Sequence, residues 1–301
     1  MLFVICHPSI PIEAQIGLAL RILCGFGIDE IASAFLSNRE TITKRLMRAK
    51  EKLRSEKIEI AMPVAVERLD AVLRTLYLLF NEGYYSETED SVLREDLCVE
   101  AMRLTYMLIE NSTTNSPDAN ALMALMCFHS SRFAARRNGN GEIILYEDQD
   151  EALWSQELIT KGMTHLKASS TGNKFSKYHL EANIASWHTV KTDSKEKWEN
   201  ILTLFNHLLA LEYSPIAALN RTYALSKVHG KEEAIRQAEK LKLENNHFYF
   251  TLLGNLYEGI DQKKSFENYQ RAYDLAKTPS QKHLIQQFLQ SKAGSPPATG
   301  E

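Results

Sequence analysis

The chain of 301 residues is long enough for two or three domains. Its composition, with 44% hydrophobic and 24% charged residues, supports real hydrophobic cores. The net charge of −3 excludes a protein that binds polyanions over its whole surface, so a nucleic-acid role would have to come from a local basic patch.

The first predicted elements are two helices joined by a tight turn, within residues 28–54. In the segment IDEIASAF, the spacing of Ile31 and Phe35 predicts a short helix that buries these two side chains. A longer helix follows the turn. It carries one apolar stripe, at positions i, i+4, i+7 and i+11, which is formed by Ile42, Leu46, Ala49 and Leu53.

This second helix is strongly basic. Residues 39–57 contain eight basic and three acidic side chains, a net charge of +5, which leaves −8 for the rest of the chain. Ser37 and Glu40 match the S-x-x-E pattern of a capping box and predict a helix start near Asn38. Short helix, tight turn and longer basic helix are the arrangement of a DNA-binding helix-turn-helix. The alternative is a basic amphipathic helix whose outer face is simply solvated.

The middle of the chain reads as helices with scattered polar groups, and the segment GEIILYE (141–147) is the one candidate for extended structure. The polar groups could form a pocket or an arginine–carboxylate network. We favour the alternative that they cap helices and pair across helix interfaces. They are Asn81, Glu82, Tyr84, Arg94, Glu100, Arg103, His129, Arg132, Arg136, the acidic run EDQD at 147–150, and Trp154.

Nothing in the sequence indicates an enzyme. Glu147, Asp148 and Asp150 lack the loop spacing by which proteins hold a hard cation. The nine histidines are scattered, and none pairs with Cys or Asp as a catalytic set requires. Glycine-rich phosphate loops and the H-E-x-x-H motif are absent. We therefore expect no catalytic residue, no metal site and no cofactor.

The last third of the chain contains a repeat. LNRTY at 219–223 recurs as LGNLY at 253–257, displaced by 34 residues, which is the period of a tetratricopeptide (TPR) helix pair. The alternative is a plain helical bundle in which the recurrence after 34 residues is coincidental. The positions that match the TPR pattern are Phe250, Leu253, Gly254 and Tyr257 on a first helix, Ser265, Tyr269 and Ala272 on a second, and Ile201, Phe205 and Leu208 on the second helix of a preceding, more divergent repeat.

The cysteines and the hydropathy pattern predict a cytoplasmic location. The four cysteines (Cys6, Cys24, Cys98 and Cys127) are far apart and form no CxxC pair, so neither a disulfide framework nor a zinc site is expected. Arg21 interrupts the best apolar run before it reaches the roughly 18 residues of a membrane span. The first residues, MLFVIC, lack the features of a signal peptide.

Several stretches carry a family resemblance. EAQIGLALRILCGFGIDEIASAFLSNRETITKRLMRAKEKLR resembles region four of bacterial sigma factors of the extracytoplasmic-function (ECF) class, and DEIASAF and ITKRLMRAKEKLR resemble its two helix-turn-helix helices. The remainder is similar to the subfamily with a long C-terminal helical extension that includes TPR-like repeats. The stretches that carry this similarity are ICHPSIPIEAQ, ERLDAVLRTLYLLFNEGY, LREDLCVEAMRL, ALMALMCFHSSRFAARRNGNGEIILYEDQDEALW and SPIAALNRTYAL.

The resemblance implies binding to the −35 promoter element and docking on the β flap of core RNA polymerase. It also assigns roles to side chains of the basic helix. The implied DNA-binding residues are Asn38, Arg39 and Thr41 near phosphates, Thr43, Lys44, Met47 and Arg48 facing bases, and Arg45, which could serve either surface.

The chain departs from the family in one respect. Region two, which clamps the polymerase core, recognises the −10 element and helps to open the duplex, does not precede region four here. Three interpretations are open. The chain is a fragment, or a natural short form that occupies −35 sites without opening promoters, or a protein whose helix-turn-helix is vestigial.

We therefore predict an all-α protein. Its predicted parts are a sigma region-four-like helix-turn-helix at 1–57, a helical middle domain at 58–165, TPR-like repeats at 166–290 and a disordered tail at 291–301. The predicted function is −35 recognition within an ECF sigma factor. The expected partners are promoter DNA, RNA polymerase and a protein or peptide that binds the repeats, with no membrane partner. The alternative function is a TPR-type protein-interaction scaffold.

Overall fold

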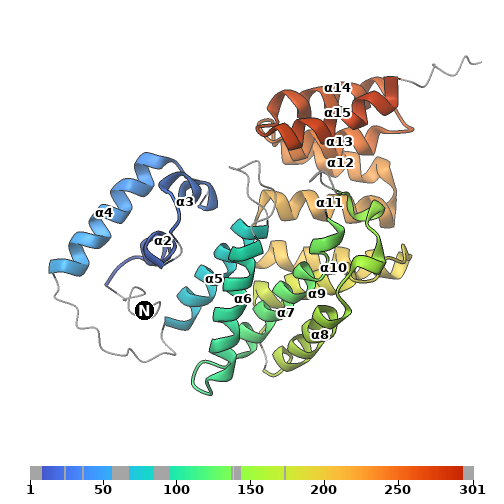
Figure 1. Ribbon diagram of the computed structural model, residues 1–301. Helices are drawn as coiled ribbons and strands as arrows, with labels where there is room; N and C mark the ends of the chain where they lie inside the picture. Colours follow the sequence, from blue (N-terminus) through green and yellow to red (C-terminus); the bar gives the residue numbers. More distant parts are fainter. Residues whose placement is uncertain are drawn as a thin grey trace, which may run out of the picture. The chain divides into compact units, whose positions relative to one another are not determined.

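The computed structural model describes residues 9–23, 25–35, 37–55, 68–84, 95–136, 138, 144–172 and 174–293 (Figure 1). Within these ranges all regular structure is helical, with 14 α-helices and no strand. The prediction of an all-α protein is therefore confirmed. The predicted boundary at residue 57 lies outside the described residues, as do Cys6 and Cys24. The chain divides into two compact units.

The first unit consists of the described residues up to Ser131 together with Ser155–Lys174. Helices α2, α3 and α4 contact one another, α2 also contacts α5, and α5 to α8 pack as successive neighbours. The helices are α2 (Ile12–Leu23), α3 (Ile28–Ala34), α4 (Arg39–Ser55), α5 (Leu69–Tyr84), α6 (Glu95–Glu110), α7 (Pro117–Ser130) and α8 (Gln156–Ser169).

A small apolar core holds α2, α3 and α4 together. Ile16, Ile31 and Leu46 contribute one buried side chain from each helix. A Cβ atom at Gly17 would lie 3.0 Å from Leu46, so the glycine lets α2 come close to α4. Because apolar burial is the main stabilising term, this core fixes which side of α4 faces inward.

Helix α7 is the most deeply buried helix of the first unit, with 11 of its 14 residues buried. It starts with Ser116, whose hydroxyl accepts a hydrogen bond from the Ala119 N–H. On α8, a Cβ atom at Gly162 would lie 2.6 Å from the Phe128 ring, so α7 and α8 pack at a distance that only glycine allows. The Cys127 thiol of α7 is buried in this core.

The second unit consists of Arg132–Trp154 and the described residues from Phe175 onward. Helices α9 to α15 follow one another as a stack in which each contacts the next (Figure 1). The elements are the 3₁₀ turns η2 (Phe133–Ala135), η3 (Tyr146–Asp148) and η4 (Glu151–Leu153), then α9 (Lys177–Trp187), α10 (Lys195–Leu211), α11 (Pro215–His229), α12 (Lys231–Leu241), α13 (His247–Tyr257), α14 (Gln262–Leu275) and α15 (Pro279–Ala293).

The packing of this stack fits a helical-repeat arrangement. The two similar segments, 219–223 and 253–257, lie on α11 and α13, which contact each other. A Cβ atom at Gly254 would lie 2.8 Å from the ring of Tyr269, and Ser265 donates a 2.8 Å hydrogen bond to the Gly254 carbonyl. All ten predicted repeat positions are buried, namely Ile201, Phe205, Leu208, Phe250, Leu253, Gly254, Tyr257, Ser265, Tyr269 and Ala272.

Two expectations fall partly outside the described residues. Of the extended candidate at 141–147, only the last four residues are described, and for Tyr146 and Glu147 the prediction is wrong. Leu145 has an extended backbone without a strand partner among the described residues, and Tyr146 begins a 3₁₀ turn. Of the predicted tail, residues 291–293 are the end of α15, and the rest is outside the described residues.

Candidate nucleic-acid interface

Helix α4 begins at Arg39, directly after a capping residue. The Asn38 side-chain oxygen accepts a 2.8 Å hydrogen bond from the Thr41 N–H, and the Asn38 carbonyl accepts from the Ile42 N–H. The predicted capping box of Ser37 and Glu40 is therefore wrong, because the capping residue is Asn38, one residue later. Asn is as good a cap as Ser. With Asn38 as the cap, Glu40 is the second residue of the helix and not the third, which is the position that a capping box requires.

The predicted apolar stripe of α4 is confirmed. Ile42 (1% exposed), Leu46 (5%) and Ala49 (4%) are buried, and Leu53 is half-buried. The helical period places other side chains on the opposite side of the helix. The exposed members of the predicted DNA-binding set are Asn38, Arg39, Thr41, Lys44, Met47 and Arg48.

Two of the exposed cations form ion pairs at the surface. The Arg39 guanidinium contacts the Asp29 carboxylate of α3, and Lys44 Nζ lies 2.6 Å from Glu40 Oε1, one turn earlier on α4. All four side chains are well exposed, so both pairs are screened by water and salt. Such pairs can exchange one anionic partner for another at small cost.

Two members of the predicted set point elsewhere. The Arg45 guanidinium carbon lies 5.9 Å from the centre of the Phe35 ring, and the side chain is half-buried. The Thr43 hydroxyl donates a 2.7 Å hydrogen bond to the Arg39 carbonyl of its own helix. Arg45 therefore packs on Phe35, directly after α3, and its assignment to the base-facing or the phosphate-facing side remains a prediction.

The basic side chains of α4 outnumber the acidic ones. Its 17 residues carry seven basic and two acidic side chains. Arg48, Lys50 and Arg54 are exposed and form no ion pair with any described residue. Exposed cations without an ion-pair partner are available to bind a polyanion.

The polar side chains of the middle segment do not form one cluster. Glu100 and Arg103 pair on α6 at 2.7 Å, and Tyr84 packs on His129 with ring centres 4.5 Å apart. Asp150 caps η4 by accepting from the Ala152 N–H at 2.9 Å. These contacts agree with capping and pairing rather than with a single pocket. Arg94 lies outside the described residues.

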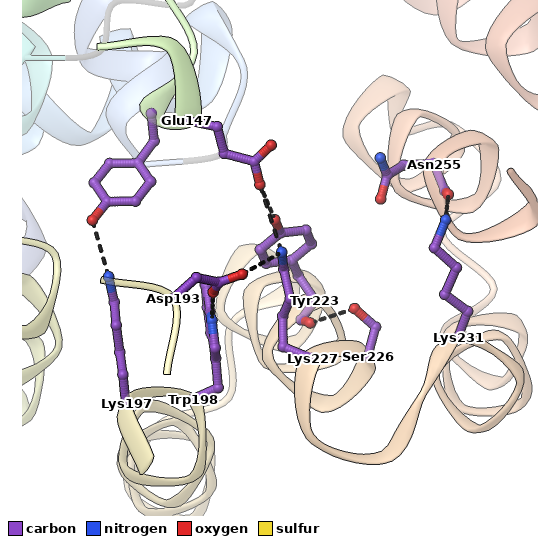
Figure 2. Close-up of polar contacts among 10 residues, drawn as sticks. Glu147, Asp193, Lys197, Trp198, Tyr223, Ser226, Lys227, Lys231 and Asn255 are labelled. Carbon is purple, nitrogen blue, oxygen red and sulfur yellow. Dashed lines mark hydrogen bonds and ion pairs between the residues drawn. The ribbon is translucent and has the colours of Figure 1, made fainter. Parts of the chain in front are cut away.

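The structure also contains a cluster that the sequence did not reveal, in the second unit (Figure 2). Its centre is Lys197, which is 2% exposed. Lys197 Nζ donates to the Tyr146 hydroxyl at 3.0 Å and to the Val190 carbonyl, and it lies 5.1 Å from the centre of the Tyr146 ring. Burial lowers the pKa of Lys197, because desolvation disfavours the charged form.

A second lysine, Lys227, lies between two carboxylates of this cluster (Figure 2). Its Nζ is 3.5 Å from Asp193 and 3.7 Å from Glu147, and Glu147 also accepts a 2.9 Å hydrogen bond from the Tyr223 hydroxyl. Asp193 accepts from the indole N–H of Trp198. This hydrogen bond, together with the charge of Lys227, lowers the pKa of Asp193.

His188 completes the cluster as a neutral ring. Its ring lies edge-on to Tyr146, with centres 5.2 Å apart, and edge-on to Trp198, with centres 6.0 Å apart. Burial and the nearby positive charges of Arg132 and Lys197 lower its pKa to about 3. No sequence signal would have joined these residues, because they come from four separate segments of the chain.

The described ranges contain no group of three or more His, Cys, Asp or Glu side chains placed to hold a metal ion. In the same ranges, no helix combines the length and the apolar character that crossing a membrane requires.

Comparisons with known proteins place the chain in a family. Residues 68–170, which span α5 to α8, match a family of unknown function, DUF6596. An uncharacterized protein of Rhizobium meliloti (strain 1021) is 34% identical over 308 residues, and the match covers 100% of this chain and 73% of the Rhizobium protein. No solved structure matches. The chain belongs to the same family as this Rhizobium meliloti protein.

Proposed function

We propose that the chain binds duplex DNA through α4 and that it is the −35-recognising part of an ECF RNA polymerase sigma factor. The observation that carries the proposal is the orientation of α4. Ile42, Leu46 and Ala49 hold one side of the helix in the core, so that Lys44 and Arg48 face outward on the other. The resemblance to sigma region four, which includes both helices α3 and α4, supports the same function.

The exposed side chains of α4 offer two kinds of DNA contact. Arg48 can bind a guanine edge with two hydrogen bonds, a contact that is worth about 1–3 kcal/mol of discrimination, and Met47 (57% exposed) offers an apolar surface to a thymine methyl group. Arg39 and Thr41, at the start of the helix, would contact phosphates, which also favour the positive end of a helix. Arg39 would exchange Asp29 for a phosphate.

The small size of the interface limits the affinity that α4 can provide. A single DNA-binding module of this kind buries only roughly 600–1,000 Å² of protein surface. We therefore expect weak, salt-sensitive binding, and no promoter opening by these 301 residues with core RNA polymerase. Docking on the β flap of the polymerase is part of the proposal on the strength of the resemblance. Run-off transcription with purified core enzyme would detect any opening activity.

Fluorescence anisotropy on a duplex selected from a randomised library tests the DNA contact. Arg48→Ala should weaken binding by roughly 5- to 150-fold, the equivalent of 1–3 kcal/mol, and should relax the sequence preference at one position. Arg39→Ala should weaken all duplexes alike and reduce the slope of affinity against salt by about one, because Arg39 is one of the residues expected near phosphates. Lys263→Ala, which removes an 85% exposed lysine from α14, is the matched control.

Two outcomes would contradict the proposal. One is the absence of any salt-dependent duplex binding by the unmodified chain. The other is an equal loss of affinity in Arg48→Ala and Lys263→Ala, which would show that the binding follows total charge rather than the face of α4. Either result would leave protein interaction through the TPR-like helices as the function to pursue.

A further inference from the structure

A loop between α7 and α8 belongs to the second unit although the helices that flank it belong to the first. Its two ends meet where the Ser155 N–H donates a 2.8 Å hydrogen bond to the Ser131 carbonyl. The part of interest is the segment 144–151, ILYEDQDE, which we name the acidic segment. It contains a 3₁₀ turn followed by the start of another. It contacts α10, α11 and the connection between α9 and α10.

The tyrosine of the acidic segment occupies a defined position on these helices. The Tyr146 hydroxyl accepts from Lys197 Nζ at 3.0 Å and donates to the Val190 carbonyl at 3.1 Å. Its ring and the ring of His188 are nearly perpendicular, with centres 5.2 Å apart. The helices thus supply a donor, an acceptor and an aromatic surface to one phenol, which is how a binding site recognises tyrosine.

The Glu147 side chain and the backbone of the acidic segment also form polar contacts with the second unit. Glu147 accepts from the Tyr223 hydroxyl at 2.9 Å and lies 3.7 Å from Lys227 Nζ (Figure 2). Lys191 donates to the Gln149 backbone carbonyl. Three lysines therefore reach three different groups of one short segment, namely a phenol, a carboxylate and a peptide carbonyl.

The acidic segment lies on the surface rather than in the core. Of its eight residues, five are exposed and only Gln149 is buried. Four of the eight are acidic, and the Glu147 side chain is 68% exposed. A segment held by polar contacts at a surface can open at a lower free energy than the core beneath it. In these respects the segment resembles a bound peptide more than a structural element.

We infer that the surface formed by Val190, Lys191, Lys197, Tyr223 and Lys227 is a recognition site for short acidic segments that contain a Tyr-Glu pair. The acidic segment fills this site in cis, and a partner protein that presents such a segment competes with it. A covalently tethered ligand acts at an effective concentration of the order of millimolar, so a partner must bind well enough to exceed this. The inference does not depend on DNA binding by α4.

A peptide in trans tests the inference on the full chain. The double variant Tyr146→Ala/Glu147→Ala removes the two side chains that fill the site. A fluorescently labelled ILYEDQDE peptide should bind this variant saturably and at least about tenfold more tightly than it binds the unmodified chain. Adding Lys227→Glu to the variant should abolish binding, whereas adding Lys263→Glu, at an exposed position on α14, should leave it unchanged.

Three results would overturn the inference. The first is no peptide binding by a double variant that retains the circular dichroism of the unmodified chain. The second is equal binding of a peptide with alanine in place of its Tyr and Glu. If the double variant loses helix signal, hydrogen exchange of the unmodified chain decides instead. The amides of 145–153 should then exchange faster than those of α10 and α11, and equal protection is the third contrary result.

Discussion

Two groups of basic side chains in this protein differ in what surrounds them. The cations of α4 stand close together in the sequence, and most of them are exposed. Arg39 and Lys44 form only surface ion pairs, and Arg48 and Lys50 form no ion pair with any described residue. Those of the second unit are far apart in the sequence, and Lys197 and Lys227 are held by phenols, carbonyls and carboxylates of the same chain. The density of basic residues along the sequence therefore does not predict which cations stabilise the fold.

The difference follows from desolvation. A charged group that leaves water must find polar partners, so Lys197 is buried only because Tyr146 and Val190 satisfy its ammonium group. An exposed cation such as Lys44 keeps its water and gains little from its partner. Such a cation can bind an external anion without loss of stability, which is the property that a DNA-binding surface needs.

The largest expected effect is on the buried lysine. Lys197→Ala should lower the free energy of unfolding of the second unit by about 2–4 kcal/mol, because it removes a packed aliphatic stem and two hydrogen bonds. All three tryptophans (Trp154, Trp187 and Trp198) lie in this unit, so tryptophan fluorescence during urea denaturation measures it selectively.

Lys197→Met is the matched control, because it retains most of the stem and loses only the ammonium group. It should be less destabilising than Lys197→Ala. If Lys197→Ala had the same free energy of unfolding as the unmodified chain, Lys197 would stabilise the fold no more than the exposed lysines of α4 do. That result would contradict the difference drawn between the two groups.

A pH effect of about 2 kcal/mol is expected from His188. Its pKa in the folded chain is about 3, whereas an unfolded histidine titrates near its ordinary value of 6.5. Below pH 6.5 the unfolded state therefore binds more protons, and stability falls as the pH decreases toward 3, by about 1.4 kcal/mol per pH unit. Above pH 7 both states are neutral and the effect disappears.

His188→Phe isolates this contribution, because phenylalanine keeps the edge contacts with Tyr146 and Trp198 but takes up no proton. Urea denaturation at pH 7.5 and pH 5 should show a smaller loss of stability for the variant than for the unmodified chain. The same loss in both proteins would mean that His188 is protonated in the folded state, and hence that the cluster is more open to water than its geometry indicates.

A smaller effect is expected at the start of α4. Asn38→Ala removes the cap of the Thr41 N–H and should destabilise the helix by about 1 kcal/mol, whereas Ser37→Ala should have little effect. Circular dichroism melting of the two variants distinguishes the cap that is observed from the capping box that the sequence pattern predicted. A larger loss in Ser37→Ala would favour the predicted box.

These cases show which features the sequence could predict. The buried side of α4 was predictable because Ile42, Leu46 and Ala49 repeat with the helical period, and local spacing suffices for that. The close approach of α13 and α14 at Gly254 and Tyr269 was predictable because a repeat reuses one packing solution. The cap was misplaced because Ser37 and Asn38 are both good capping residues, and the pattern alone does not choose between them.

The cluster of the second unit was not predictable for a different reason. Tyr146 and Lys197 are 51 residues apart, and Glu147 and Tyr223 are 76 residues apart. Contacts over such separations depend on the path of the loop between α7 and α8, which no local pattern encodes. In the sequence, the run EDQD was compatible with a pocket or an arginine–carboxylate network and with capping and pairing of helices. Only the fold places Glu147 against a tyrosine and a lysine.

The smallest expected effect on stability comes from the same change, lysine to alanine, on α4. Lys44→Ala removes only a surface ion pair with Glu40, and its side chain is 63% exposed, so stability should change by no more than about 0.5 kcal/mol. Circular dichroism should show an unchanged melting curve, and the tryptophan transition of the second unit should not move. A loss comparable to that of Lys197→Ala would mean that Lys44 is bound within the fold, and α4 would then lack the free cationic face on which the proposed DNA contact depends.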